Sequence, residues 1–355
     1  MNNKITFSAF ADLHYKKGMY VASIENVKDI FKRAEENGAE LVVHLGDMCN
    51  DYFRSTELIK AYLENDQKLD VCGVYGNHEL ETMGNDMPFV TPLLTNVEDR
   101  AIWGTESGAI EDGKIAYYYF DKGNFRFICT DTNYSVNLKT GEYEHNKPAS
   151  WGPPEENTNP DALGTEQLEW LRGVLMASAN EGKHCIVLSH ATFCDLWSGL
   201  EGASADAKAV QKLFKEANSI KENTVILALN GHYHNNRHAI IDGVVYIDLN
   251  TVRSGWWQFE RFCGYAEENV DDPKFTFKYT EYDQGGNPAH SFNRPLSSLT
   301  MGEQTLFYKN PLSAIITVGE DGSVDVLGMR TEWMYGIAPK AKYLNTQLEI
   351  SNFKK

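Results

Sequence analysis

The sequence predicts an α/β fold, because apolar runs typical of strands alternate with segments of helical periodicity. Apolar residues recur every three or four positions over residues 24–34, after Thr165 and around Val210. Gly38 follows the first of these segments, where a helix end is expected. Five apolar runs end, in chain order, at Asp12, Asp47, Asn77, His190 and His234. This order is the strand–helix–strand rhythm of an α/β protein.

Three further stretches predict antiparallel hairpins. Their turns are expected at residues 122–124, 242–243 and 321–322, where Gly, Asp or Asn separates two apolar runs. A mixed sheet, or two stacked sheets with helices outside, therefore fits better than a purely parallel sheet.

We expect one domain over residues 1–355, with a metal-binding core over about 1–250 and a C-terminal elaboration over about 251–355. The last hairpin is expected to complete a sheet. The aromatic stretch after residue 250 carries Arg253 and Arg261, and it either packs in the core or supplies a cap or substrate wall.

Charge and cysteine usage exclude several classes of protein. The 33 Lys and Arg against 50 Asp and Glu give a net charge of −17, which disfavours nucleic-acid and anionic-membrane partners. None of the six cysteines has CxxC spacing, so reduced thiols in a cytoplasmic protein are expected. No apolar run approaches the roughly 20 residues of a membrane span, and the N-terminus has no convincing signal-peptide cleavage site.

Polar side chains follow the five apolar runs where each predicted strand ends. The carboxyl ends of strands in open α/β sheets line the ligand crevice, so these side chains are expected to converge. In an extended strand, His232 and His234 would point to the same face, with Tyr233 turned away between them. The candidate metal ligands are Asp12, His14, Asp47, Asn77, His190, His232 and His234.

Seven ligands are too many for one transition-metal ion, but they suit two ions if a carboxylate bridges them. All seven offer nitrogen or oxygen and none a thiolate, which favours Mn, Fe, Zn or Co. The four imidazoles argue against a site built only for Mg or Ca.

In chain order the sequence carries DLH at 12–14, GD at 46–47, GNHE at 76–79, a strand-end His190 and GHYH at 231–234. This series resembles the calcineurin-like metallophosphoesterase superfamily over roughly residues 4 to 250, with motifs DxH, GD, GNH[DE], H and GHxH. The resemblance implies a four-layer sandwich, with helices outside two mixed sheets.

The resemblance also implies a role for each residue. One ion would take Asp12, His14, Asp47 and His234, and the other would take Asp47, Asn77, His190 and His232. Asp47 would bridge, so the two histidines of GHYH would bind different ions. His78 would contact the phosphate and protonate or stabilise the leaving oxygen.

Two divalent ions opposed by two carboxylates leave a local charge of about +2, which attracts phosphate. A hydroxide shared by the ions could then attack phosphorus in line. We therefore expect a metallophosphoesterase that hydrolyses small phosphate esters, whether monoesters, diesters such as cyclic nucleotides, or nucleotide diphosphates. A nuclease of the same superfamily is disfavoured by the negative charge. A silent scaffold is disfavoured because every ligand position is filled.

Two departures from the patterns of known subgroups disfavour an iron–tyrosinate centre and protein dephosphorylation. Asn50 stands where purple acid phosphatases carry a tyrosine ligand, and "GDMCNDY" lacks the GDxVDRG pattern of the protein Ser/Thr phosphatases. Either Asn50 or Asp51 is a candidate to orient His78.

Several other residues stay outside the predicted site. His44 and His184 are expected to be packed or surface histidines, and whether Asp131 and Asn133 reach the site is left open. His145 lies in a long Pro- and Asn-rich segment, residues 137–164, which is expected to be a loop that could form a rim or lid. Each of Gly46, Gly76 and Gly231 precedes a candidate ligand, where either an ordinary turn or a close backbone approach is plausible.

Overall fold

The fold is carried by two seven-stranded mixed sheets that pack face to face. The computed structural model describes residues 3–15, 24–48, 69–82, 94–95, 97–104, 110–111, 114–115, 117–145, 158–197, 203–234, 236–252, 276–282, 288–295, 310–329 and 350–353.

The first sheet places the strands that precede three predicted ligands side by side. In spatial order its strands are β21 (Ile350–Phe353), β20 (Val324–Gly328), β19 (Ala314–Gly319), β1 (Lys4–Phe10), β2 (Leu41–His44), β3 (Asp70–Gly73) and β4 (Leu94–Thr95). Strands β1, β2 and β3 are parallel, whereas the other neighbouring pairs are antiparallel. The predicted C-terminal hairpin, β19 and β20, therefore extends this sheet from β1 outward.

The second sheet has a parallel centre with antiparallel edges. In spatial order its strands are β15 (Arg237–Ile241), β16 (Val244–Asp248), β14 (Val225–Asn230), β13 (His184–Ser189), β9 (Phe125–Cys129), β8 (Tyr118–Lys122) and β5 (Ile102–Trp103). The four strands β16, β14, β13 and β9 run parallel, so β13 and β14 end at the same edge.

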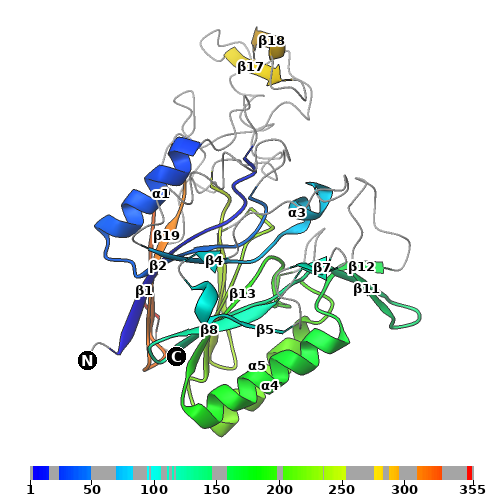
Figure 1. Cartoon of the computed structure of the whole chain (residues 1–355), viewed down its shortest axis with the longest axis vertical. Helices are drawn as coiled ribbons and strands as arrows, with labels where there is room; N and C mark the ends of the chain where they lie inside the picture. The colour runs from blue at the N-terminus through cyan, green and yellow to red at the C-terminus, as the bar shows by residue number, and fades with distance from the viewer. Residues whose placement is uncertain are drawn as a thin grey trace.

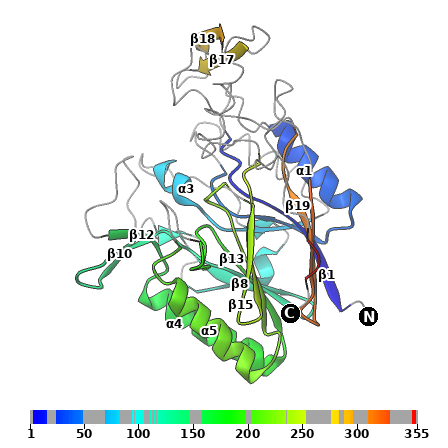
Figure 2. The ribbon, with the colours of Figure 1, turned by 180° about the vertical axis from the view of Figure 1, so that it is seen from behind.

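Helices cover the outer face of each sheet and complete four layers (Figures 1 and 2). Helix α1 (Ile24–Glu36) packs on the first sheet, while α4 (Thr165–Glu181) and α5 (Ala207–Ile220) pack on the second. Side chains alternate accordingly in β2, where Leu41 and Val43 face the second sheet and Val42 faces α1. The four-layer α/β architecture is thus confirmed.

Aromatic rings fill the space between the sheets. Phe7 of the first sheet meets Phe127 of the second edge to face, with ring centroids 5.5 Å apart. Phe120 stacks on Phe127 from the neighbouring strand at 5.3 Å. This buried layer fixes the two sheets against each other, and it therefore fixes the relative positions of their strand ends.

The predicted hairpins form where expected. The turn between β15 and β16 has Asp242 and Gly243 in the left-handed region, at φ 49° and 80°, which a tight two-residue hairpin turn requires. Strands β8 and β9, and β19 and β20, pair in the same way. None of the helices that the structure describes is long and apolar enough to cross a membrane.

The expectation of a loop over residues 137–164 was wrong, because this segment contains two strands and the end of a third. Strands β10 (Tyr134–Asn137), β11 (Tyr143–His145) and β12 (Thr158–Ala162) form a three-stranded antiparallel sheet, which we call the arm. The turn between β10 and β11 is closed by Gly141, at φ 72°, and by the Asn137 side chain, which accepts hydrogen bonds from two backbone N–H groups. Residues 146–157 lie outside the described part of the chain, and a role of the segment as a rim or lid stays a prediction.

The remaining elements are short or lie apart from the two sheets. They are α3 (Asn77–Thr82), the 3-10 helix η2 (Glu98–Arg100), and the hairpins β6 (Ile110–Glu111) with β7 (Lys114–Ile115) and β17 (Thr276–Tyr282) with β18 (Pro288–Pro295). Arg253 and Arg261 lie outside the described residues, and the division of the chain at about residue 250 stays a prediction.

Candidate metal centre

The loops that follow β1 and β2 run side by side at the carboxyl edge of the first sheet. The N–H groups of Asp12 and His14 donate to the carbonyls of Gly46 and Asp47, at 3.1 and 2.8 Å. Since β3 is the next parallel strand, the residues that follow it reach the same edge. Across the layer between the sheets, β13 and β14 supply their own strand ends, so that all seven predicted ligands are brought together.

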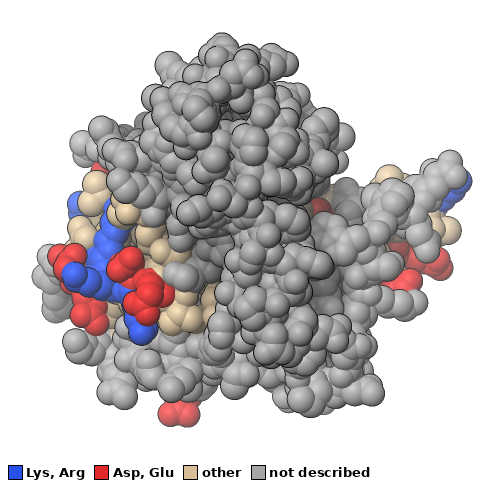
Figure 3. Space-filling model, turned by 90° about the horizontal axis from the view of Figure 1, so that it is seen from above, with Lys and Arg blue, Asp and Glu red and all other residues tan. Residues whose placement is uncertain are grey.

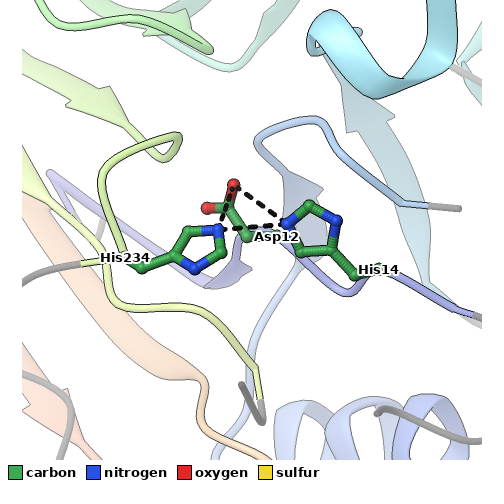
Figure 4. A group of neighbouring side chains, drawn as sticks. All are labelled: Asp12, His14 and His234. Carbon is green, nitrogen blue, oxygen red and sulfur yellow. Dashed lines mark hydrogen bonds and ion pairs between the residues drawn. The ribbon is translucent and has the colours of Figure 1, made fainter. Parts of the chain in front are cut away.

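Three of the seven predicted ligands, Asp12, His14 and His234, form the first group (Figure 4). The Nε2 atoms of the two histidines lie 3.0 Å apart. The Asp12 Oδ1 atom lies 3.4 Å from His234 Nε2 and 4.0 Å from His14 Nε2. All three side chains are almost fully buried, so their ligand atoms point at one enclosed position.

The second group consists of Asp47, His190, His232 and Asn77, and it centres on the imidazole of His190. The His190 Nε2 atom lies 3.2 Å from Asp47 Oδ2, 3.2 Å from Asn77 Oδ1 and 3.1 Å from His232 Nδ1. The other ring nitrogen, Nδ1, donates to the Leu45 carbonyl at 2.6 Å. This hydrogen bond leaves the Nε2 lone pair of a neutral His190 facing the other members of the group.

Asp47 lies between the two groups. Its Oδ2 atom is 3.2 Å from His190 Nε2 in the second group and 3.9 Å from His14 Nε2 in the first. Its Oδ1 atom accepts a hydrogen bond of 2.9 Å from the N–H of His78. The carboxylate is held by that bond and faces imidazoles of both groups with its other oxygen.

The donor set fits divalent transition-metal ions. It combines four imidazoles, two carboxylates and one amide oxygen, without a thiolate. The Nε2 atoms of His14 and His234 face each other at 3.0 Å, a separation that requires a shared proton or a cation between two lone pairs. Among the described residues, the buried Nδ1 atom of His234 has no hydrogen-bond partner.

The sequence matches the model of the calcineurin-like phosphoesterase family over residues 5–236. The chain belongs to the calcineurin-like phosphoesterase family. Its reaction class is therefore the hydrolysis of phosphate esters. A search of curated protein sequences gives no significant match.

Three of the solved structures that resemble this chain come from an animal, a fungus and a bacterium. A dimetal phosphatase from Danio rerio has 15% identity and a TM-score of 0.49, with 89% of this chain and 96% of that chain covered. A 5′-nucleotidase from Candida albicans has 13% identity and a TM-score of 0.39, with 90% and 51% covered. A phosphopantetheinyl hydrolase from Mycobacterium tuberculosis has 15% identity and a TM-score of 0.34, with 71% and 91% covered.

The GHYH turn of this phosphoesterase differs from the extended strand that we expected. Strand β14 ends at Asn230, and His232 and His234 have left-handed backbones, at φ 72° and 50°. The His232 N–H donates to both carboxylate oxygens of Asp12, at 3.1 and 3.0 Å, which bends the chain back toward the first sheet. The two histidines belong to different groups, and a tight turn rather than strand geometry separates them. That they bind different ions stays a prediction.

Residues with a left-handed backbone cluster at the candidate metal centre. Of the seven described non-glycine residues with positive φ, five are predicted ligands, including Asp12, His14 and Asp47. Such conformations are uncommon outside glycine and cost of order 1 kcal/mol or more each. They persist here because hydrogen bonds across the strand ends hold the backbone, and their clustering is typical of a functional site.

Glycines leave room for the ligand carboxylates. A Cβ atom on Gly231 would lie 2.6 Å from Asp12 Oδ2 and 2.7 Å from Ala11 Cβ. On Gly76 it would meet Asp47 Oδ1 and the ring of His190, and Gly46 is similarly crowded. Close backbone approach is therefore the physical requirement at these three motif positions.

Glu79 is a site residue for which the sequence analysis assigned no role. Its buried carboxylate accepts hydrogen bonds from the N–H groups of Asp47, Met48 and Gly76, at 2.9, 2.6 and 2.6 Å. Burial, followed by the nearby Asp47 carboxylate, raises the pKa of Glu79 to about 7. Its place directly after the ligand and His78 in GNHE was the available signal. The three hydrogen bonds show that it ties the loops after β2 and β3 together.

His78 is buried beside both groups, at the start of α3. Its Nε2 atom lies 3.9 Å from Asp47 Oδ2, and its ring packs edge to face on His14 with centroids 4.8 Å apart. With His14 and Asp47 it also forms a third set of side chains that could hold an ion. The candidates for orienting His78, Asn50 and Asp51, lie outside the described residues.

Electrostatics favour neutral imidazole at His14 and ionised carboxylate at Asp47. Burial, followed by the neighbouring His78, lowers the pKa of His14 to about 3. Burial alone would raise the pKa of Asp47, but His190, His78 and His14 outweigh it and hold that pKa well below its usual value. Burial would lower the pKa of His190, but the Asp47 carboxylate outweighs it and raises the pKa to about 10.

The residues that we did not predict as ligands have hydrogen-bonding or packing partners in the structure. Asp131 Oδ1 accepts hydrogen bonds from the backbone and side-chain amides of Asn133, at 2.9 and 3.0 Å, and Asp131 belongs to none of the groups of possible metal ligands among the described residues. His44 is fully buried against Gly73, and the Nδ1 atom of His184 donates a hydrogen bond of 2.6 Å to the Asn223 carbonyl. Both are packed histidines, as expected. His145 lies in β11 of the arm.

Proposed function

We propose that this phosphoesterase binds two divalent ions and hydrolyses small phosphate esters. The observation that carries the proposal is the position of Asp47, whose Oδ2 atom lies 3.2 and 3.9 Å from imidazole nitrogens of two different groups. One carboxylate placed in this way is what a pair of ions sharing a ligand requires.

The proposed ligands follow the two groups. The first ion takes Asp12, His14, Asp47 and His234, and the second takes Asp47, Asn77, His190 and His232. Bound there, such ions supply Lewis acidity at a phosphoryl oxygen and lower the pKa of water. The donor set favours Mn, Fe, Zn or Co, and imidazoles in both groups weigh against Mg or Ca alone.

We assign to His78 the contact with the phosphate and with the leaving oxygen. Its buried ring lies next to Asp47 and His14, at the junction of the two groups, which supports this role over that of a distant packed histidine. An imidazole at that point can donate a hydrogen bond or a proton to an oxygen on which negative charge develops.

We expect small phosphorylated substrates, which are monoesters, diesters such as cyclic nucleotides, or nucleotide diphosphates. A nuclease is disfavoured by the net charge of −17. On the described part of the face in Figure 3, acidic and basic side chains lie side by side instead of gathering into a basic stripe. The four described cysteines are free and buried, which agrees with the cytoplasmic location that we propose.

Metal analysis and a substrate panel test the proposal. Protein loaded with Mn, Zn or Co should hold about two ions per chain and should hydrolyse at least one of four substrates: a monoester, a linear diester, a cyclic nucleotide or a nucleotide diphosphate. A metal-loaded protein that is inert on the whole panel would favour a scaffold, and degradation of DNA would favour the nuclease.

The variant Asp47→Asn tests the bridging carboxylate. Loss of several kcal/mol of transition-state stabilisation corresponds to a roughly thousandfold or greater fall in kcat/KM. Asp242→Asn is a matched control, because Asp47 and Asp242 have nearly the same left-handed backbone, at φ 51° and 49°. Full activity of Asp47→Asn would contradict the proposed bridge.

A further inference from the structure

The two ring nitrogens of His232 face different surroundings. Its Nδ1 atom lies 3.1 Å from His190 Nε2, within the second group. Its Nε2 atom lies 3.8 Å from Asp161 Oδ2 on the other side of the ring. Asp161 belongs to β12 of the arm, outside the family's motifs.

A histidine that binds a metal through one nitrogen commonly donates the proton on its other nitrogen to a carboxylate or a carbonyl, which fixes the tautomer and the ring orientation. His190 follows this pattern, since its Nδ1 atom donates to the Leu45 carbonyl at 2.6 Å. His232 has the Asp161 carboxylate in the corresponding place. The separation of 3.8 Å is longer than a hydrogen bond. A proton on Nε2 would nevertheless face this carboxylate at a distance that a shift of about 1 Å would close.

Asp161 is itself held in place by the body of the molecule. Its carbonyl accepts a hydrogen bond of 2.8 Å from the N–H of Ala205, just before α5. The buried Asp206 carboxylate then accepts the N–H groups of Leu163 and Gly164, at 2.7 and 3.3 Å. The residues that follow Asp161 are therefore fixed against the start of α5.

The arm is tied to the same carboxylate. The hydroxyl of Tyr143 in β11 donates to Asp206 Oδ1 at 2.6 Å.

The side chains of His232 and Asp161 are 14% and 16% exposed, so water screens their interaction only in part.

We propose that Asp161 is a positioning residue for His232. Its carboxylate favours the tautomer with the proton on Nε2 and leaves the Nδ1 lone pair toward the second group, so that affinity for the second ion depends on the arm. This inference rests on the proposed function, because it requires that two ions bind.

Titration of the metal-free full-length protein with Mn²⁺ or Co²⁺, followed by calorimetry, tests the inference. The wild-type protein should bind two ions. In Asp161→Ala the affinity for one ion should fall by about 10- to 100-fold, the size typical of carboxylates behind histidine ligands. The affinity for the other ion should stay unchanged. In the Co²⁺-loaded protein, the absorption bands of one site should change and those of the other should not.

Two further variants keep the result interpretable. Glu142→Ala removes an exposed carboxylate from the same arm and should bind both ions as the wild type does. Asp161→Asn keeps the shape and one acceptor oxygen but loses the charge, so its affinity for the second ion should lie between those of the wild type and Asp161→Ala. If Asp161→Ala does not fold, the lower affinity of Asp161→Asn for the second ion is the test.

The inference is overturned if either Asp161 variant binds both ions with wild-type affinity, or if both affinities fall together with the melting temperature of the metal-free protein. A wild-type protein that binds no second ion would instead overturn the proposed function. The two failures are therefore distinguishable.

Discussion

The two ligand groups of the candidate centre differ in depth and in what supports them. The first group, Asp12, His14 and His234, is almost fully buried. The second group is less enclosed, since Asn77 is partly exposed and the His232 side chain is 14% exposed and faces the arm. An enclosed group is expected to be rigid, whereas the more open group is suited to meet the substrate.

Replacing one histidine of either group by alanine should change ion affinity the most, and it should do so for one ion only. We expect His234→Ala to lose the first ion and keep the second, and His232→Ala to do the reverse. Each lost affinity should fall by more than about a hundredfold, because a direct ligand contributes more than the residue behind it. Native mass spectrometry counts the ions. His238→Ala, at an exposed histidine of β15, is the control, and loss of both ions in either ligand variant would break the contrast.

Glu79→Gln should weaken both groups together, because Glu79 holds the loop that carries the shared Asp47. The amide replaces one acceptor oxygen by a donor that faces backbone N–H groups, at a cost of about 1–3 kcal/mol. Thermal unfolding should show this loss, and both ion affinities should fall by roughly similar factors. A selective loss of one ion would mean that Asp47 does not serve both groups.

Gly231→Ala should damage the first group more than the second. The added methyl group meets Asp12 Oδ2 and Ala11 Cβ at 2.6 and 2.7 Å, and relief of such crowding costs about 1–3 kcal/mol. Gly173→Ala is the matched control within α4, where a Cβ atom meets nothing within 4 Å. There the same substitution should stabilise the protein by about 0.5–1 kcal/mol in chemical denaturation. Equal effects at both positions would contradict the close approach to Asp12.

Tyr143→Phe should have the smallest effect and should act on the second group alone. It removes the hydroxyl that ties the arm to Asp206, worth about 0.5–1.5 kcal/mol. Only part of that should reach the second ion, as a few-fold weaker affinity in calorimetry. The first ion serves as the internal control, and an equal change in both affinities would show that the arm does not act selectively.

Periodicity and turn chemistry predicted the helices, the hairpins and the convergence of the strand ends. That convergence follows from topology, because the strands before Asp12, Asp47 and Asn77 are parallel neighbours. The backbone of the GHYH turn could not be predicted in this way. Its left-handed residues depend on the Asp12 carboxylate, which accepts the His232 N–H from the opposite sheet.

Two further features were hidden for other physical reasons. The strands of the arm are short and lie among Pro, Asn and Gly residues, so their composition resembles that of a loop. Glu79 and Asp161 were also missed. The place of Glu79 in GNHE was the one signal for it, but its hydrogen bonds to the N–H groups of Asp47 and Met48 cannot be inferred from a single sequence. Asp161 lies outside the motifs, and its closeness to His232 depends on a contact far away in the sequence.

Anomalous diffraction from crystals loaded with Mn or Zn is the most direct test of the two-ion centre. We expect two peaks per chain, with Asp47 touching both ions, His234 on one and His232 on the other. A single peak that binds both histidines of the GHYH turn, or two peaks without a shared Asp47, would contradict it.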